Sequence, residues 1–303
     1  MNVFFALGWY FKLQWRKYAT AITLFVLVDL LEMSLPLITG LIIDSVVSRT
    51  LTTQSLVGYG VLIVGIAIAV YILRFLWRIT LFSASFYLAE LMRQRLYHLL
   101  TRMAPGFFQK YRTGDLMARA TNDISAVEMA AGEGVLSAID GLMTSIFVLT
   151  IMTFIIDWKL TLIALLPFPI MAWFFKTIGS RLHNSFRDAQ ERFSELNDRV
   201  QESIAGIRMI KSFGREKAED VAFLEIADRA AEANMSVAKT DSLYDPAIFL
   251  TVGTSYFLCV SAGGYMVYTG DLTLGMLTSF TMYLGYLIWP MFAYGWLMNI
   301  AER

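Results

Sequence analysis

The segment KYRTGDLMARATND, Lys110 to Asp123, lies between long apolar runs, yet it is rich in charged and small polar residues. Its Thr-Gly pair supplies cap and turn chemistry, and Asp115 stands where a carboxylate favours a helix N-terminus. The segment therefore predicts the turn of a helical hairpin that projects from a membrane. Taken alone, the segment also fits an ordinary turn between two solvent-exposed helices.

The composition of the whole chain indicates a membrane protein. Of its 303 residues, 57% are hydrophobic and 17% are charged, and the mean hydropathy is +0.56. A soluble domain has an apolar share of about 45–50%. The 25 basic and 25 acidic residues cancel, so no bulk field attracts nucleic acid. The single cysteine, Cys259, excludes an internal disulfide framework or a cysteine-based metal cluster.

Six apolar runs are long enough, or nearly so, to cross a bilayer as helices of about 20 residues. They cover approximately residues 18–47, 56–75, 134–156, 160–176, 246–268 and 272–300. The sequence DWK at 157–159 predicts a tight polar turn between the third and fourth spans. An even number of spans returns the chain to its starting side, so both termini are expected in one compartment.

The distribution of Lys and Arg predicts the orientation of these spans. Of the 25 basic residues, only Arg49 and Lys159 fall in the short loops on one side. We therefore expect a multi-pass protein of the plasma (inner) membrane, with both termini and both long loops in the cytoplasm. Residues 1–17 place aromatic side chains ahead of a basic cluster, which predicts an interfacial elbow helix instead of a cleavable signal.

Both long loops, at about 76–133 and 177–245, continue the helical pattern past the bilayer. In the second loop, apolar residues recur at helical spacing from Leu182 to Ile207, until Gly214 interrupts the pattern. In the first, a helix is expected to run towards Phe107, and RTGDL is expected to break it. Residues 181–240 hold ten basic and eleven acidic side chains, which suits solvated helices and argues against a nucleic-acid groove. Two such tips on the cytoplasmic side predict docking of a soluble partner.

At this point the sequence resembles a known family. The segments FFQKYRTGDLMARATND and QESIAGIRMIKSFGREKAE, with six spans and short outer loops, look like the transmembrane domain of a type IV ABC exporter. The phrases AGEGVL, SLYDPAIFL and NIAER are similar to multidrug-resistance-like half transporters of the MdlA type. The resemblance covers essentially the whole chain. It implies an all-α membrane fold over residues 18–303, with six transmembrane helices and two long cytoplasmic hairpins that end in coupling helices.

The resemblance also implies where ATP-binding domains dock. The coupling helices would be Tyr111–Met117 and Phe213–Glu219, each resting on a nucleotide-binding domain. The residues expected at these contacts are Tyr111, Arg112, Thr113, Gly114, Asp115 and Leu116 in the first tip, and Phe213, Gly214, Arg215 and Glu216 in the second.

Nothing in the chain predicts ATP hydrolysis of its own. It contains no G-x-x-x-x-G-K-[ST] loop, and no Gly is followed by Lys. ATP and Mg²⁺ are therefore expected in nucleotide-binding domains that either follow Arg303 in a longer polypeptide or belong to a separate one. His98 and His183 stand alone on charged helices and predict solvated side chains, so we expect no catalytic residue, no metal site and no cofactor in this chain.

Asp29 and Glu32 lie three residues apart near the middle of the first span. An ionised carboxylate at that depth costs at least about 2.5 kcal/mol unless it faces water or a partner. We expect this face to line a transport cavity that favours cationic amphipathic substrates. Further candidates from the last span are Tyr283, Tyr286 and Trp289.

Three simpler interpretations also fit these two carboxylates. One or both are protonated, they pair within the bundle, or they mark a helix kink before Pro36. Asp140 is weaker evidence for a cavity, because its distance from the outer turn places it near the inner interface.

We predict that the chain forms one half of an alternating-access exporter for amphipathic or hydrophobic compounds such as drugs. One set of six spans encloses only half a cavity, so a second half transporter is expected, in a heterodimer or a homodimer. The alternatives are lipid or peptide export and, from another class, an ion-coupled carrier or a channel.

Overall fold

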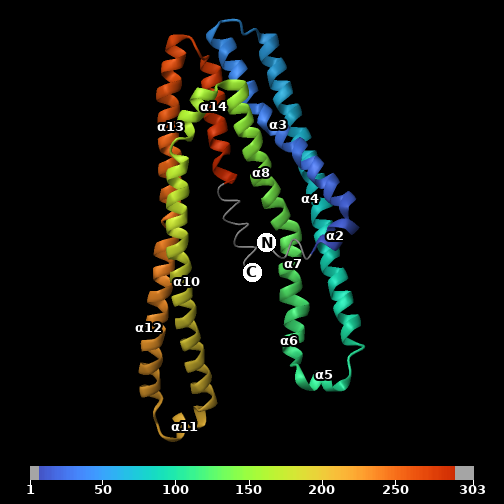
Figure 1. The fold of residues 1–303 in the computed structure, drawn as a ribbon, viewed down its shortest axis with the longest axis vertical. Helices are drawn as coiled ribbons and strands as arrows, with labels where there is room; N and C mark the ends of the chain where they lie inside the picture. The colour runs from blue at the N-terminus through green and yellow to red at the C-terminus, as the bar shows by residue number, and fades with distance from the viewer. Residues whose placement is uncertain (1–6, 291–303) are drawn as a thin grey trace. The chain divides into compact units, whose positions relative to one another are not determined.

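The structure, a computed structural model of the 303-residue chain, describes residues 7–290, and its regular elements in that range are all helices (Figure 1). The chain divides into two compact units. The first contains Met1–Thr161 and Cys259–Arg303, and the second contains Leu162–Leu258. The helices α9 (Trp158–Leu165) and α13 (Tyr244–Thr269) pass from one unit into the other.

The first unit is built around α3, which packs against α4, α8 and α14. Its helices are α2 (Gly8–Leu13), α3 (Trp15–Val47), α4 (Thr53–Leu100), α5 (Pro105–Lys110), α6 (Thr113–Ala118), α7 (Ile124–Met129), α8 (Val135–Thr150) and α14 (Leu274–Tyr286). The core between α3 and α4 is aromatic and aliphatic, with Phe25 against Trp77 at 5.4 Å between ring centroids. Between membrane helices, close van der Waals packing of such side chains contributes to stability, because lipid is as apolar as they are.

The short helix α2 is attached to α4 by one buried tyrosine. Tyr10 is fully buried, and its hydroxyl donates a 2.6 Å hydrogen bond to the carbonyl oxygen of Ala84. Burial, with a contribution from Tyr87, raises the pKa of Tyr10 to about 12, so this hydroxyl stays protonated and remains a donor at neutral pH. On the same helix, the ring centroid of Trp9 lies 4.2 Å from the guanidinium carbon of Arg95, which makes a cation–π contact.

The first hairpin turns earlier than the sequence predicts. The expected helix towards Phe107 is wrong, because α4 ends at Leu100. Pro105 has no backbone N–H and holds the residue before it extended, so the helix cannot continue through it. The separate helix α5 then lies across the end of the hairpin (Figure 1). Tyr111 and the next residue are extended, and the ascending helix begins at Thr113.

The ascending helix runs from Thr113 to Ile156 and changes its winding along the way. Within the described residues it contains three π-helical segments, η1 (Arg119–Asp123), η2 (Ala130–Gly134) and η3 (Ile151–Ile156). After η3, the Asp157 carboxylate accepts a 2.8 Å hydrogen bond from the backbone N–H of Leu160. The sequence predicted a polar turn at 157–159; the structure places the break at Asp157 alone, and Trp158 and Lys159 already belong to α9.

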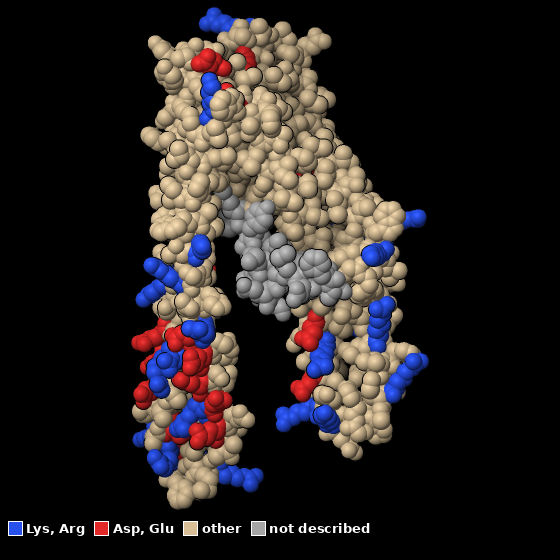
Figure 2. All heavy atoms as spheres, in the orientation of Figure 1, with Lys and Arg blue, Asp and Glu red and all other residues tan. Residues whose placement is uncertain are grey.

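The second unit contains the second long hairpin. It consists of α10 (Phe168–Ala205), the short α11 (Ile207–Ser212) and α12 (Glu216–Asp241). The prediction of two long helices joined by a turn is confirmed, but the first helix ends at Ala205, before the last apolar residue of the predicted stripe. Gly214 has φ +63°, a conformation that favours glycine, and it turns the chain into α12. In Figure 2 the Lys, Arg, Asp and Glu side chains of this hairpin gather towards its α11 end.

A polar cluster joins α10 to α12 near this tip. Arg199 donates a 2.7 Å hydrogen bond to Glu219, and the Ser203 hydroxyl lies 2.5 Å from the other oxygen of that carboxylate. Both charged side chains are 25% exposed, so the pair is partly screened by solvent.

We expect Arg199→Ala to lower the local opening free energy of the hairpin end by about 1–2 kcal/mol, because it removes a charge-assisted bond between two helices. Hydrogen exchange of the α11 amides measures this. Arg192→Ala is the matched control: its partners Asp188 and Glu195 lie on the same helix and are exposed, so a change of less than about 0.5 kcal/mol is expected. Equal protection losses in both variants would contradict the assignment.

Five helical stretches within the described residues are long and apolar enough to cross a membrane. They are Trp15–Val47, Thr53–Leu100, Thr113–Ile156, Trp158–Ala205 and Glu216–Thr269. They contain the first five predicted spans. The sixth predicted span, 272–300, begins in α14, and its residues 291–300 lie outside the described part of the chain.

Candidate functional site

The predicted carboxylates Asp29 and Glu32 project from α3 into the first unit. Arg74 of α4 donates a hydrogen bond to Glu32 and forms an ion pair with it. This ion pair agrees with one of the simpler interpretations of the two carboxylates, namely that they pair with other residues within the helix bundle. Asp29 is 4% exposed, and its Oδ2 atom has no hydrogen-bond partner among the described residues. A buried carboxylate oxygen without a partner is rare in folded proteins and calls for a physical explanation.

Asp140 of α8 joins these two carboxylates, although sequence reasoning placed it near the inner interface. Its charge acts on both Asp29 and Glu32. Trp289 donates a hydrogen bond from its indole N–H to Asp140, and the Thr144 hydroxyl donates another at 3.3 Å. We call Asp29, Glu32, Asp140 and Arg74 the carboxylate layer. Only the fold brings α8 to α3, so no short-range sequence signal could have placed Asp140 there.

The aromatic candidates of the last span serve different contacts. Tyr283 is fully buried and donates its hydroxyl to the carbonyl oxygen of Met33, which holds α14 against α3. The ring of Tyr286 lies 6.5 Å from the ring of Tyr283. Trp289 is 59% exposed apart from its bond to Asp140. In this conformation Trp289 and Tyr286 are the accessible members of the three.

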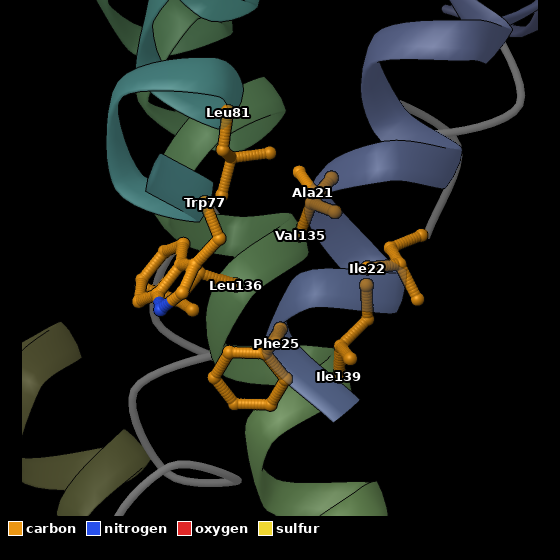
Figure 3. Close-up of a pocket in the computed structure, with 8 residues that line it drawn as sticks. All are labelled: Ala21, Ile22, Phe25, Trp77, Leu81, Val135, Leu136 and Ile139. Carbon is orange, nitrogen blue, oxygen red and sulfur yellow. The ribbon is translucent and has the colours of Figure 1, made fainter. Parts of the chain in front are cut away.

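An apolar pocket lies between α3, α4 and α8, on the side of the carboxylate layer that is nearer to the start of α3. Figure 3 shows its eight lining side chains, which are Ala21, Ile22, Phe25, Trp77, Leu81, Val135, Leu136 and Ile139. The rings of Phe25 and Trp77 meet edge to face at its wall. The indole N–H of Trp77 is buried and has no hydrogen-bond acceptor among the described residues. The cavity measures about 10 Å³, roughly the space of one water molecule, so these side chains are closely packed in this conformation.

Near the far end of α3, this helix and α14 cross at two glycines, a contact that sequence reasoning missed. A Cβ atom added to Gly275 would collide with the carbonyl oxygen of Gly40 and with the Asp44 carboxylate. Asp44 accepts a 2.7 Å bond from the backbone N–H of Gly275 and a 2.6 Å bond from the Thr273 hydroxyl. It thereby caps the N-terminus of α14 from a different helix. We call this contact the glycine crossing.

Further hydrogen bonds continue from the glycine crossing towards the carboxylate layer. Pro36 has no backbone N–H, so α3 lacks one bond of its helical ladder at this point. Ser279 of α14 donates a 2.7 Å hydrogen bond to the carbonyl oxygen of Pro36, and the Tyr283 bond to Met33 lies one turn away, so α14 supports α3 on both sides of the interruption. Small residues at the crossing allow the two backbones to approach closely. The sequence signal that could have located the start of α14 is Thr273, followed by Gly275, at the beginning of an apolar run, because Thr is a preferred N-cap residue.

The residues predicted for coupling lie beside the short transverse helices, not in them. In the first tip, Tyr111 and Arg112 are extended and Thr113 to Leu116 form the first turn of α6. In the second, Phe213 to Arg215 form the turn and Glu216 starts α12. The transverse helices are α5 and α11. Exposed apolar side chains mark both tips: Phe108 and Tyr111 in the first, and Ile207, Met209 and Phe213 in the second.

Comparison with known proteins assigns these features to a type of protein. Residues 18–291 match a family model described as the ABC transporter transmembrane region. The chain is 46% identical over its full 303 residues to the multidrug resistance-like ATP-binding protein MdlA of Escherichia coli, and the match covers 51% of that protein. It is 41% identical over 298 residues to the probable multidrug resistance ABC transporter ATP-binding/permease protein YheI of Bacillus subtilis, covering 98% of this chain and 51% of that protein.

A more distant relative has a different named role. The chain is 28% identical over 192 residues to the ATP-dependent lipid A-core flippase of Syntrophus aciditrophicus, covering 62% of this chain and 31% of that protein. This chain thus spans about half the length of the curated relatives that match it along its whole length. Within the described residues, no group of three or more His, Cys, Asp or Glu side chains could hold a metal ion.

Proposed function

The chain belongs to the family of ABC transporter transmembrane regions, and on this premise we propose that it forms the membrane half of an ATP-driven exporter of amphipathic or hydrophobic compounds. The observation that carries the proposal is its similarity, over every residue, to multidrug-resistance-like ABC transporters. We further propose six spans with both termini in the cytoplasm, since 23 of the 25 basic residues lie on that side of the predicted topology. ATP binding elsewhere in the complete transporter would shift the population of inward-open and outward-open states.

The two hairpin tips are the proposed contacts with nucleotide-binding domains. Each tip combines a short transverse helix with exposed apolar side chains, Phe108 in the first and Phe213 in the second. The tips extend to the segments 111–117 and 213–219, which the family resemblance indicates. The rigid helices α4, α10 and α12 behind them can carry a displacement into the membrane.

The transport pathway is proposed to need a second half transporter, of the same or a related kind. Candidate substrate contacts are Asp29, Glu32, Tyr283, Tyr286 and Trp289. Their charge favours cations, and their rings offer surfaces that many amphipathic compounds can contact. Similarity to a protein named as a lipid A-core flippase supports lipid export as the second candidate function.

The first test is the mass of the natural gene product, measured with an antibody against the cytoplasmic hairpins. A mass near twice the 34.3 kDa of this chain supports an ATPase domain on the same polypeptide. A product of 34.3 kDa with no co-purifying ATPase would overturn the proposal.

The second test is ATP-dependent uptake of a neutral lipophilic dye into inside-out vesicles that contain the complete transporter. Uptake that stops on ATP depletion supports an exporter. Uptake that continues unchanged would favour an ion-coupled carrier or a channel. Stimulation of the ATPase by lipids alone, and by no drug-like compound, would favour lipid export.

A further inference from the structure

We propose that the junction of α2, α3 and α4 binds the headgroup of an anionic phospholipid in the cytoplasmic leaflet of the membrane. This lipid is a bound component of the transporter and not the exported compound. Its place in that leaflet rests on the proposed topology, whereas its binding can be measured without ATP. Three observations support the site: an excess of positive charge, the exposed apolar side chains among these charges, and the depth of the junction in the membrane.

The junction carries positive charge that no ion pair cancels. Lys12, Arg16 and Lys17 are exposed, and residues 1–28 contain no Asp or Glu. Among residues 7–290, neither these three side chains nor Arg95 of α4 form a salt bridge. We call these four residues the basic junction. Figure 2 shows blue side chains along the α2 and α4 edge of the first unit, separate from the red ones of the first hairpin.

Two of the four cations lie over aromatic rings. The Lys17 ammonium is 5.7 Å from the ring centroid of Tyr87, and the Arg95 guanidinium carbon is 4.2 Å from that of Trp9. The first contact joins α3 to α4, and the second joins α4 to α2. Because an aromatic ring is neutral, both side chains keep their full charge, and their remaining N–H groups can donate to phosphate oxygens.

Helix stability does not explain the cations at the start of α3. Arg16 and Lys17 lie in its first turn, which contains no acidic residue, and the N-cap residue Gln14 makes no side-chain hydrogen bond. The helix dipole makes this end of α3 positive, so two cations are unfavourable there. A neighbouring anion would offset this repulsion, as a lipid phosphate does when it lies beside the basic junction.

The side chains among these cations favour a lipid over a soluble acidic partner. Trp9, Leu13 and Trp15 are 40%, 58% and 60% exposed. Trp is enriched at the membrane interface, and apolar side chains beside Lys and Arg are typical of segments that lie in the headgroup region. A phospholipid offers both matching parts in one molecule, because its phosphate contacts the cations and its acyl chains cover the apolar side chains.

The basic junction also lies at a suitable depth. The 33 residues of α3 span about 50 Å, whereas the hydrocarbon core is about 30 Å thick and the bilayer with its headgroups about 40–45 Å. An end of α3 therefore reaches the headgroups, and the end that carries Arg16 and Lys17 is the one that anionic headgroups attract.

A lipid bound here would stabilise more than α2. Besides the bond from Tyr10 to Ala84, the Tyr18 hydroxyl donates a 3.1 Å hydrogen bond to the carbonyl oxygen of Ala131 in η2. The rings of Tyr10 and Tyr18 meet edge to face at 6.4 Å between centroids. The junction is thus connected to both helices of the first hairpin, so a bound lipid should raise the melting temperature of the transporter.

The test compares phosphatidylglycerol with phosphatidylcholine of identical acyl chains, which differ in net headgroup charge. The delipidated complete transporter is titrated with each lipid without ATP, and native mass spectrometry counts the bound molecules. We expect one phosphatidylglycerol per copy of this chain that binds at least about tenfold more tightly than phosphatidylcholine. The triple variant Lys12→Gln, Arg16→Gln and Lys17→Gln should bind this lipid at least about tenfold more weakly.

Two further triple variants separate charge from structure. Lys12→Arg, Arg16→Lys and Lys17→Arg keep every charge and should stay within about threefold of the parent, a rescue that a merely structural role would not give.

The matched control is Arg208→Gln, Lys211→Gln and Lys217→Gln, which removes two Lys and one Arg from exposed positions at the tip of the second hairpin. It should leave the affinity within about twofold. Thermal unfolding in phosphatidylcholine nanodiscs checks that each variant is folded. A folded triple Gln variant of the basic junction that binds phosphatidylglycerol as tightly as the parent would overturn the proposal. So would equal affinity of the parent for the two lipids.

The experiment separates failure of this site from failure of the proposed function. ATP-dependent uptake of the neutral dye, with lipid binding unaffected by the triple Gln variant, would remove the site and keep the exporter. Lipid binding that depends on the basic junction, without ATP-dependent export of any compound, would keep the site and overturn the proposed function.

Discussion

Gly275→Val is expected to disrupt the glycine crossing and to lower the free energy of unfolding by about 3 kcal/mol. The added side chain would begin where the backbone oxygen of Gly40 and the carboxylate of Asp44 already lie, and backbone cannot move aside without separating α3 from α14. The hydrogen bonds from the N-terminus of α14 to Asp44 would be lost together with the contact. Thermal unfolding of the purified transporter in nanodiscs measures the effect.

The matched control for this variant is Gly60→Val on α4. A Cβ atom at Gly60 has no neighbour within 4 Å, so the same chemical change should leave the melting temperature close to that of the parent. Asp44→Asn is the intermediate case, because an amide oxygen can still accept one of the two bonds at the helix end. It should cost about 1 kcal/mol. Equal melting temperatures for Gly275→Val and Gly60→Val would contradict the close approach of the two helices.

Arg74→Ala is expected to have the second-largest effect, a loss of about 2–3 kcal/mol in the free energy of unfolding. It leaves Glu32 charged inside a span without its cation, near the carboxylates Asp29 and Asp140, which repel it. The double variant Arg74→Ala with Glu32→Gln should recover most of the loss, because it removes the charge that was left unpaired. Chemical or thermal unfolding of the four proteins gives the double-mutant cycle.

Arg78→Ala serves as the control for the loss of an arginine from the same helix. The Arg78 guanidinium lies over the ring of Phe82 at 5.9 Å and is exposed, so a loss of about 0.5 kcal/mol is expected. If Arg74→Ala costs no more than Arg78→Ala, Glu32 has another partner or is protonated. Additive effects of Arg74→Ala and Glu32→Gln would lead to the same conclusion.

Most of the helices could be predicted from the sequence because helix formation depends on local properties of the chain. Uncharged runs of membrane length predicted the helices at α3 and α4, and the Asp157 turn followed from three residues. The ends of the hairpins were predicted less well. The sequence predictions used the more conspicuous RTGDL and Gly214 and did not include Pro105 and Gly206, two recognisable helix breakers that follow α4 and α10.

The site depended on contacts between helices that are distant in sequence. Asp29 and Glu32 could be chosen by charge and depth, but their neighbours Arg74 and Asp140 come from α4 and α8. Spacing along one helix carries no information about which residue of another helix faces it. The glycine crossing could not be predicted for the same reason, because the sequence around Gly40 does not show that α14 packs against it.

The π-helical segments make the ascending helix tolerant of changes in length. η2 ends at Gly134, immediately before the turn that carries Val135 and Leu136 into the pocket and Asp140 into the carboxylate layer. A π-helical turn holds one more residue than an α-helical turn while keeping its ladder of hydrogen bonds. Losing that residue would rotate everything after it by about 100°. A single insertion or deletion at such a point can therefore exchange the whole set of α8 side chains that face the pocket, which no single substitution can do.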